Sequence, residues 1–303
     1  MTSRHLFSFP ASFLIWPVRP VFGVLAVLLL AVAGTGPARA AQPVDLDLEL
    51  VLAIDVSRSI DEVEARMQRE GTAAALRGKQ VIQAIKGGIL GKIAVAYLDY
   101  SSSDYNEVVV DWRLIASEKD SLDFAARLSA APLTLGRRTS ISDAIEQGVR
   151  MIQGNDFQGT RRIIDISGDG PNNAGILVND ARNAANKLRI TINGLPIINN
   201  RPGFGNRFSL TDLDRYYQGC VIGGFGAFMV IAKDFKDFAR AIRRKLIFEI
   251  AGGGPVRPPR LLRRVAEGRI GGGAGYTYAK GCDIGERMWQ GIRDFPFIDD
   301  GDN

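Results

Sequence analysis

Apolar residues along the chain alternate between short unbroken runs and longer stretches with helical spacing. The run Leu50-Val-Leu-Ala-Ile54 contains no polar residue, which is typical of a strand covered on both faces. From Ile60 onward apolar residues recur at spacings of three and four, which predicts a helix that continues to about Ile85. The alternation of strand and helix persists to Ile250. It predicts an α/β fold of the Rossmann-like, doubly wound kind, with a mostly parallel sheet and helices on both faces.

The later elements follow from the same pattern. Strands are expected at residues 91–98, 108–112, 161–167, 190–198 and 227–232, and helices at 117–130, 140–153, 177–188, 210–217 and 233–250. A turn-rich loop without a helix joins the strands at 91–98 and 108–112, so we expect a hairpin and one antiparallel edge strand. The last helix carries a basic run that we interpret as its solvated face: Arg240, Arg243, Arg244 and Lys245.

The two ends of the chain depart from this pattern. Residues 1–40 combine basic residues, the apolar run Val21–Ala33 and the sequence Ala38-Arg-Ala40, which together predict a cleavable secretory signal and a periplasmic or secreted protein. The apolar run is shorter than the ~20 residues that a spanning helix needs, so a membrane anchor by an uncleaved signal is the weaker alternative. Residues 253–303 are Gly- and Pro-rich, and we expect a tail with one short helix at 282–292. The α/β domain therefore covers residues 46–252.

Composition excludes several classes of function. The only histidine, His5, lies in the predicted signal, so the mature chain lacks a His for a Ser-His-Asp triad, a zinc-protease motif or a histidine general base. Removal of residues 1–40 lowers the formal charge from +5 to +2, because they contain three Arg and no acidic residue. This balance gives no reason to expect nucleic acid as a partner. Cys220 and Cys282 can form a disulfide in an exported chain, stay free or pair with another molecule, and the sequence does not choose.

Polar residues gather at three places where expected strands end. Asp55, Ser57 and Ser59 follow the first strand, Thr139 precedes the helix at 140–153, and Asp169 follows the strand at 161–167. In an open parallel sheet these places lie at the carboxyl edge, where ligands bind. Carboxylate and hydroxyl oxygens are ligands that suit a hard divalent cation such as Mg²⁺. The sequence therefore predicts a cation site at this edge.

Each of the three places also has a purely structural interpretation. Ser59 and Glu62 have the spacing of a capping box at the start of a helix. Thr139 can cap the helix that follows it, and Asp169-Gly170 is a common turn pair. The neighbouring pair Asn172-Asn173 is interpreted as solvated loop residues. Three such coincidences on one edge of a sheet are less expected than one shared site.

The order and context of these residues resemble the metal-ion-dependent adhesion site of von Willebrand factor type A domains. In that family a D-x-S-x-S motif follows the first strand, a Thr lies in a later loop and an Asp-Gly follows the fourth strand. The matching residues here are Asp55-Val-Ser57-Arg-Ser59, Thr139 and Asp169-Gly170. Gly136-Arg-Arg-Thr139 departs from the Gly-Gly-Thr that is common in the family. The resemblance covers about residues 46–252, and the chain is also similar to an uncharacterised bacterial family of such domains.

The resemblance implies a recognition module in which Ser57, Ser59 and Thr139 ligate Mg²⁺ or Mn²⁺ directly, while Asp55 and Asp169 act directly or through water. Hydroxyl ligands leave positive charge on the cation, so an unidentified protein partner is expected to add an acidic side chain to it. That is a binding mechanism, and no catalytic residue is expected. Two alternatives stay open: a metal-dependent hydrolase of the phosphatase type, and a structural domain with a vestigial metal site.

Overall fold

A five-stranded sheet forms the centre of the computed structural model, which describes residues 42–198, 210–252 and 276–293. The strands are β2 (Leu48–Asp55), β3 (Ile93–Tyr100), β4 (Asn106–Ile115), β6 (Arg162–Gly168) and β7 (Thr191–Pro196). Their order across the sheet is β4-β3-β2-β6-β7. All neighbours pair in parallel except β3 and β4, which are antiparallel. The predicted α/β class and its antiparallel edge strand are confirmed.

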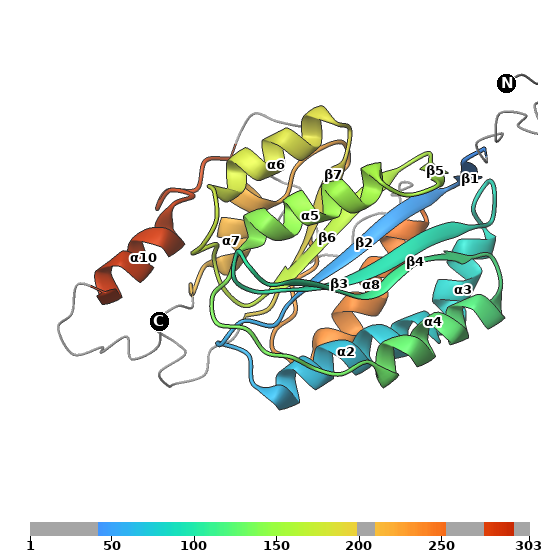
Figure 1. The fold of residues 1–303 in the computed structure, drawn as a ribbon, viewed down its shortest axis with the longest axis horizontal. Helices are drawn as coiled ribbons and strands as arrows, with labels where there is room; N and C mark the ends of the chain where they lie inside the picture. Colours follow the sequence, from blue (N-terminus) through green and yellow to red (C-terminus); the bar gives the residue numbers. More distant parts are fainter. Residues whose placement is uncertain (1–41, 199–209, 253–275, 294–303) are drawn as a thin grey trace, which may run out of the picture. The chain divides into compact units, whose positions relative to one another are not determined.

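Helices cover both faces of this sheet (Figure 1). One face carries α5 (Ile141–Gln153) and α6 (Val178–Lys187), and the other carries α2 (Glu62–Leu76), α3 (Lys79–Lys86), α4 (Glu118–Ala130) and α8 (Phe238–Ile250). Alternate residues of β2 belong to two different cores, because successive side chains of a strand point to opposite faces. Leu50 and Leu52 pack with α2 and α8, whereas Val51 and Ala53 pack with α5 and α6. A strand buried on both faces explains the unbroken apolar run.

Smaller elements complete the described part of the chain. They are a two-stranded parallel sheet of β1 (Val44–Leu46) and β5 (Phe157–Gly159), the short helix α7 (Leu213–Tyr216), the π-helical turn η2 (Tyr217–Val221) and the tail helix α10 (Ile284–Arg293). A disulfide joins Cys220 of η2 to Cys282, which resolves the choice that the sequence left open. None of the described helices has the length and apolar character needed to cross a membrane. The predicted signal at residues 1–40 lies outside the described residues.

The first predicted helix was wrong in its start and in its buried face. It is two helices, α2 and α3, separated at Gly78, and α2 begins after Asp61 rather than after Ser59. Val63, which the spacing placed inside, is 61% exposed. The inward face of α2 instead carries polar side chains such as Gln68 and Arg69, whose partners lie far away in the sequence. An apolar periodicity cannot reveal such a face.

The predicted strand at residues 227–232 is not a regular strand. The segment lies beside β7 and makes isolated parallel bridges, Gly194 with Met229 and Ile197 with Ala232. Gly194 donates to the carbonyl of Phe228 and accepts from Val230, and the next donor in a parallel ladder would be residue 196. That residue is Pro196, which has no N–H. The missing donor interrupts the ladder.

The basic run on α8 is only partly solvated. Arg240 and Arg243 are exposed as expected, but Lys245 is completely buried. Lys245 lies three residues after Ile242, so it shares the inward stripe of the helix with the apolar residues. Counting it among the solvated residues was therefore an error, and its buried partners are described below.

Candidate metal centre

The five residues predicted to bind a cation meet at the carboxyl edge of the sheet. Asp55 ends β2, and its Oδ1 accepts a hydrogen bond from the Ser57 backbone N at 2.7 Å. Thr139 Oγ1 lies 3.1 Å from Ser57 Oγ, which lies 3.2 Å from Ser59 Oγ. Ser59 Oγ donates to Asp169 Oδ1 at 2.6 Å. The ends of β2 and β6 and the loop before α5 thus contribute to one connected group of two carboxylates and three hydroxyls, named here the edge cluster.

The edge cluster is almost closed to solvent. Asp55 is completely buried, and Ser57, Thr139 and Asp169 are buried as well. Ser59 is partly exposed, which makes it the member of the cluster nearest to solvent. A ligand reaching the group would therefore meet it from the Ser59 side.

The charge of Asp55 is poorly compensated by the described residues. Its Oδ2 is buried and has no hydrogen-bond partner, although Ser57 supplies one to Oδ1. Burial, and then the nearby charge of Asp169, raise the pKa of Asp55 well above its usual value. A buried carboxylate oxygen without a donor is costly unless a cation neutralises it. The residues present therefore fit a bound divalent cation.

The backbone of β6 approaches Asp55 so closely that a side chain would not fit there. A Cβ on Gly168 would lie 3.0 Å from Asp55 Oδ2 and 2.8 Å from the hydroxyl of Tyr100. Tyr100 donates that hydroxyl to the carbonyl of Ser167 at 3.1 Å. Glycine just before Asp169 is thus a requirement of packing around the carboxylate.

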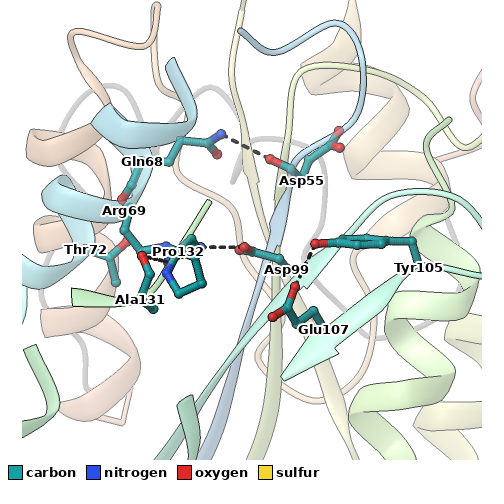
Figure 2. Close-up of polar contacts among 9 residues, drawn as sticks. All are labelled: Asp55, Gln68, Arg69, Thr72, Asp99, Tyr105, Glu107, Ala131 and Pro132. Atoms are coloured by element: carbon teal, nitrogen blue, oxygen red, sulfur yellow. Dashed lines mark hydrogen bonds and ion pairs between the residues drawn. The ribbon is translucent and has the colours of Figure 1, made fainter. Parts of the chain in front are cut away.

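Polar residues of α2 hold the end of β2 and the neighbouring strand (Figure 2). Gln68 Nε2 donates to the Asp55 carbonyl at 3.1 Å, and Arg69 pairs with Asp99 of β3 at 2.5 Å. Arg69 also donates to the backbone carbonyls of Ala131 and Pro132. Burial raises the pKa of Asp99 to about 7 although Arg69 opposes the shift. The sequence did not reveal these residues as buried. The partners of Arg69, for example, lie 30 or more residues away along the chain.

Neither hydroxyl that was given a capping alternative caps a helix. The capping box of α2 is formed by Asp61 and Glu64, two residues beyond the predicted Ser59 and Glu62. The N-cap of α5 is Ser140, and not Thr139. The side chains of Ser59 and Thr139 are therefore available to the edge cluster, and the capping interpretations are wrong.

The two asparagines after Asp169 are buried, which corrects their interpretation as solvated loop residues. Asn173 Oδ1 accepts from the Thr139 backbone N at 2.9 Å, and its own N donates to the Thr139 carbonyl at 2.8 Å. Asn172 Oδ1 accepts from the backbone N of Ser142 at 3.0 Å. The loop after β6 thus fixes the loop that carries Thr139. These asparagines are buried although the loop is polar, so the composition of the loop predicted their exposure wrongly.

The tail is attached to the same two loops. Glu286 of α10 accepts from Asn172 Nδ2 at 2.7 Å, and a Cβ on Gly285 would lie 1.9 Å from the Asn172 carbonyl oxygen. The Arg138 guanidinium, next to Thr139, lies 4.6 Å from the centre of the Trp289 ring. With the disulfide at Cys282, these contacts bring the tail against the walls of the edge cluster. The sequence left the state of Cys282 open and gave no sign of the contacts with Asn172 and Arg138.

The chemistry of the edge cluster is that of an oxygen-ligand site. Among the described residues, no group of three or more His, Cys, Asp or Glu side chains is placed to hold a metal ion. The edge cluster has two Asp, and its other oxygens come from Ser57, Ser59 and Thr139. Such a donor set suits a hard cation and disfavours a soft one.

Several solved structures are similar to this chain in fold. The pilus adhesin SpaC of Lactobacillus rhamnosus GG is 13% identical, with a TM-score of 0.49 over 68% of this chain and 30% of that one. Proximal thread matrix protein 1 of the mussel byssus, solved with zinc in its MIDAS motif, is 10% identical, with a TM-score of 0.47 over 68% and 46%. A von Willebrand factor type A protein of Catenulispora acidiphila is 14% identical, with a TM-score of 0.44 over 69% and 43%.

The chain spans less than half the length of these solved chains, and likeness at this level concerns the fold alone. No curated protein matches the sequence. The chain belongs to the family described as "Protein of unknown function (DUF1194)", whose model matches residues 45–254. The predicted resemblance to von Willebrand factor type A domains and to an uncharacterised family is confirmed.

Proposed function

We propose that this chain is an exported recognition module that binds Mg²⁺ or Mn²⁺ at Asp55, Ser57, Ser59, Thr139 and Asp169, and a protein partner through that cation. The observation that carries the proposal is the buried Oδ2 of Asp55, which has no hydrogen-bond partner beside a row of hydroxyls that ends at Asp169. A divalent cation would offset the cost of burying these two carboxylates together.

The edge cluster leaves part of the charge of a bound cation for a partner to compensate. Three of its five side chains are neutral hydroxyls, which compensate the charge of a cation less than carboxylates would. When bound, the cation supplies a concentrated positive charge to which a partner's carboxylate can attach. Two exposed residues near the edge cluster in the sequence are positively charged as well. Arg58 lies between Ser57 and Ser59, and Arg137 lies two residues before Thr139. Such complementarity favours an acidic protein surface.

Titration of the full chain with Mg²⁺ and with Mn²⁺ tests the cation site. We expect calorimetric heat and a stabilisation of about 2.7 kcal/mol when free cation is at a hundred times its Kd. Asp55→Asn keeps the size of the side chain and an acceptor for Ser57 N but removes the charge, so both signals should vanish. Asp123→Asn, at an exposed carboxylate on α4, is the matched control and should behave as wild type. Absence of heat and of stabilisation in the wild type would leave a vestigial site as the answer.

The partner is tested separately. Pull-down from the exported fraction should recover a protein with Mg²⁺ present and lose it with chelator or with Asp55→Asn. Equal recovery in excess chelator would show that the cation does not bridge the two proteins. Turnover of a phosphoester panel that is lost in Asp55→Asn would instead revive the hydrolase alternative, which needs an Asp or Glu as base because the residues after 40 contain no His.

A further inference from the structure

A second group of charged residues lies deep between the sheet and α8. Lys245 and Glu249 are one helical turn apart on α8, and Asp165 projects from β6 toward them. The side chains of all three are completely buried. Lys245 Nζ lies 2.6 Å from Asp165 Oδ1 and 2.5 Å from Glu249 Oε1. We name these residues the core triad; it shares no residue with the edge cluster.

We propose that Lys245 and Asp165 condense into an intramolecular amide bond, joining Nζ to the side-chain carboxyl carbon, with Glu249 carrying the proton. Condensation needs an amine in contact with a carboxyl group, an acid beside both, and a place from which water is excluded. The core triad meets each requirement, and the proposal does not depend on the cation site.

The carboxyl group of Asp165 is open to attack. Both of its oxygens are buried, and the close polar contact that the structure gives them is the ion pair of Oδ1 with Lys245 Nζ at 2.6 Å. A carboxylate that is stabilised in a protein interior normally accepts several hydrogen bonds. Apart from the contact with Lys245, the described residues give Asp165 no hydrogen bond. Nothing competes with Nζ for this group.

Glu249 is placed and tuned to move a proton. Its Oε1 accepts from Lys245 Nζ and, at 2.8 Å, from Asn193 Nδ2, while Oε2 has no hydrogen-bond partner. Burial, and then the charge of Asp165, raise the pKa of Glu249 to about 7. Near neutral pH it can therefore both give and take a proton. The ring of Phe228, 5.3 Å from Nζ, covers the amine with apolar surface.

The reaction balances without any other reagent. Starting from the ammonium and the carboxylate, the N–C bond forms and one C–O bond of Asp165 breaks. Two of the three protons on Nζ leave with that oxygen as water, and the third stays on the amide. Glu249 takes two protons from Nζ, one after the other, delivers each to the departing oxygen, and ends unchanged. The product is neutral, so a buried ion pair, which is costly, is replaced by an amide.

Mass spectrometry of the reduced and denatured full chain decides the proposal. We expect a mass lower by one water molecule than the sequence requires. A tryptic digest should contain a branched peptide that joins residues 163–182 to the segment starting at Lys245, with no cleavage after Lys245. Recovery of the unlinked 163–182 peptide, together with cleavage after Lys245, would overturn the proposal and leave an ordinary ion triad. This wild-type result needs no variant.

Variants then separate the roles of the three residues. Asp165→Ala should regain the full mass, and Glu249→Gln should form the bond about a hundredfold more slowly. Lys119→Ala is the matched control, because Lys119 forms an exposed ion pair with Asp123 at the same helical spacing as Lys245 and Glu249. Its mass should still lack one water. Complete formation of the Lys245–Asp165 amide bond in Glu249→Gln would show that Glu249 takes no part in the reaction.

Discussion

Two groups of buried acids lie along β6 and are compensated in different ways. In the core triad, Asp165 faces the Lys245 amine, so the chain itself supplies the partner of the carboxyl group, as an ion pair or as the proposed amide, and no solvent reaches the group. In the edge cluster, just past the end of the same strand, Asp169 joins Asp55, whose Oδ2 has no hydrogen-bond partner. From this difference we expect an external ion at the carboxyl edge of the sheet, where a ligand has access.

The comparison breaks most severely if Lys245 is removed. Lys245→Met leaves two carboxylates buried without their partner, and we expect a loss of about 3–5 kcal/mol in the free energy of unfolding. Urea denaturation measures it. Lys236→Met, at an exposed lysine just before α8, should change little. A loss below about 1 kcal/mol in Lys245→Met would show that the core triad is not sealed as described.

The tail gives the next largest effect. Cys282→Ser opens a disulfide that spans 62 residues of sequence, and a loss of about 2–4 kcal/mol is expected. Because α10 contacts Asn172 and Arg138, beside the edge cluster, the Kd for Mg²⁺ should also rise. Cys220→Ser should match it in both measurements. A lower stability with an unchanged Kd for Mg²⁺ would show that the tail does not support the cation site.

Removal of a charge from the edge cluster should change the stability in the opposite direction from removal of a charge from the core triad. Without any divalent cation, Asp55→Asn is expected to be at least as stable as wild type, because a buried charge lacking a partner is lost. Urea denaturation in chelator measures this. A variant about 2 kcal/mol less stable than wild type would show that Asp55 is already compensated, and the contrast between the two groups would fail.

The effect that depends on pH concerns the support beneath the edge cluster. The folded-state pKa of Asp99 is about 7, above an unfolded value near ~3.9, so the folded state holds its proton more tightly. The stability that this provides is complete below about pH 4 and is lost as the pH rises through 7. Between pH 5 and pH 8 we expect wild type to lose about 2–3 kcal/mol more than Asp99→Asn. Asp111→Asn, at an exposed acid on β4, should keep the wild-type slope.

The sequence was sufficient for the centre of the sheet because β2 and β3 are buried on both faces and contain unbroken apolar runs. It was also sufficient to predict which polar residues meet, since Asp55, Thr139 and Asp169 each follow or precede an element whose end lies at one edge. Parallel topology converts three separate positions in the chain into one place.

What escaped prediction were polar side chains that turn inward. Gln68, Arg69 and Lys245 look like solvated positions in the sequence, and each is buried only because its partner sits on a distant element. The same applies to α10, whose contacts with Asn172 depend on a disulfide that spacing did not settle. A pattern of apolar spacing carries no information about such pairs.

The proline that ends β7 has a consequence for how the folded chain behaves among its own copies. An exposed strand edge is a template on which another chain can add, and natural proteins blunt such edges. Residues 228–232 cover the edge of β7, but Pro196 prevents a continuous ladder there. Replacing this proline with alanine would allow a regular sixth strand to form and would present a straighter outer edge to solvent. We therefore expect the irregularity at Pro196 to limit the pairing of this edge with another copy of the chain.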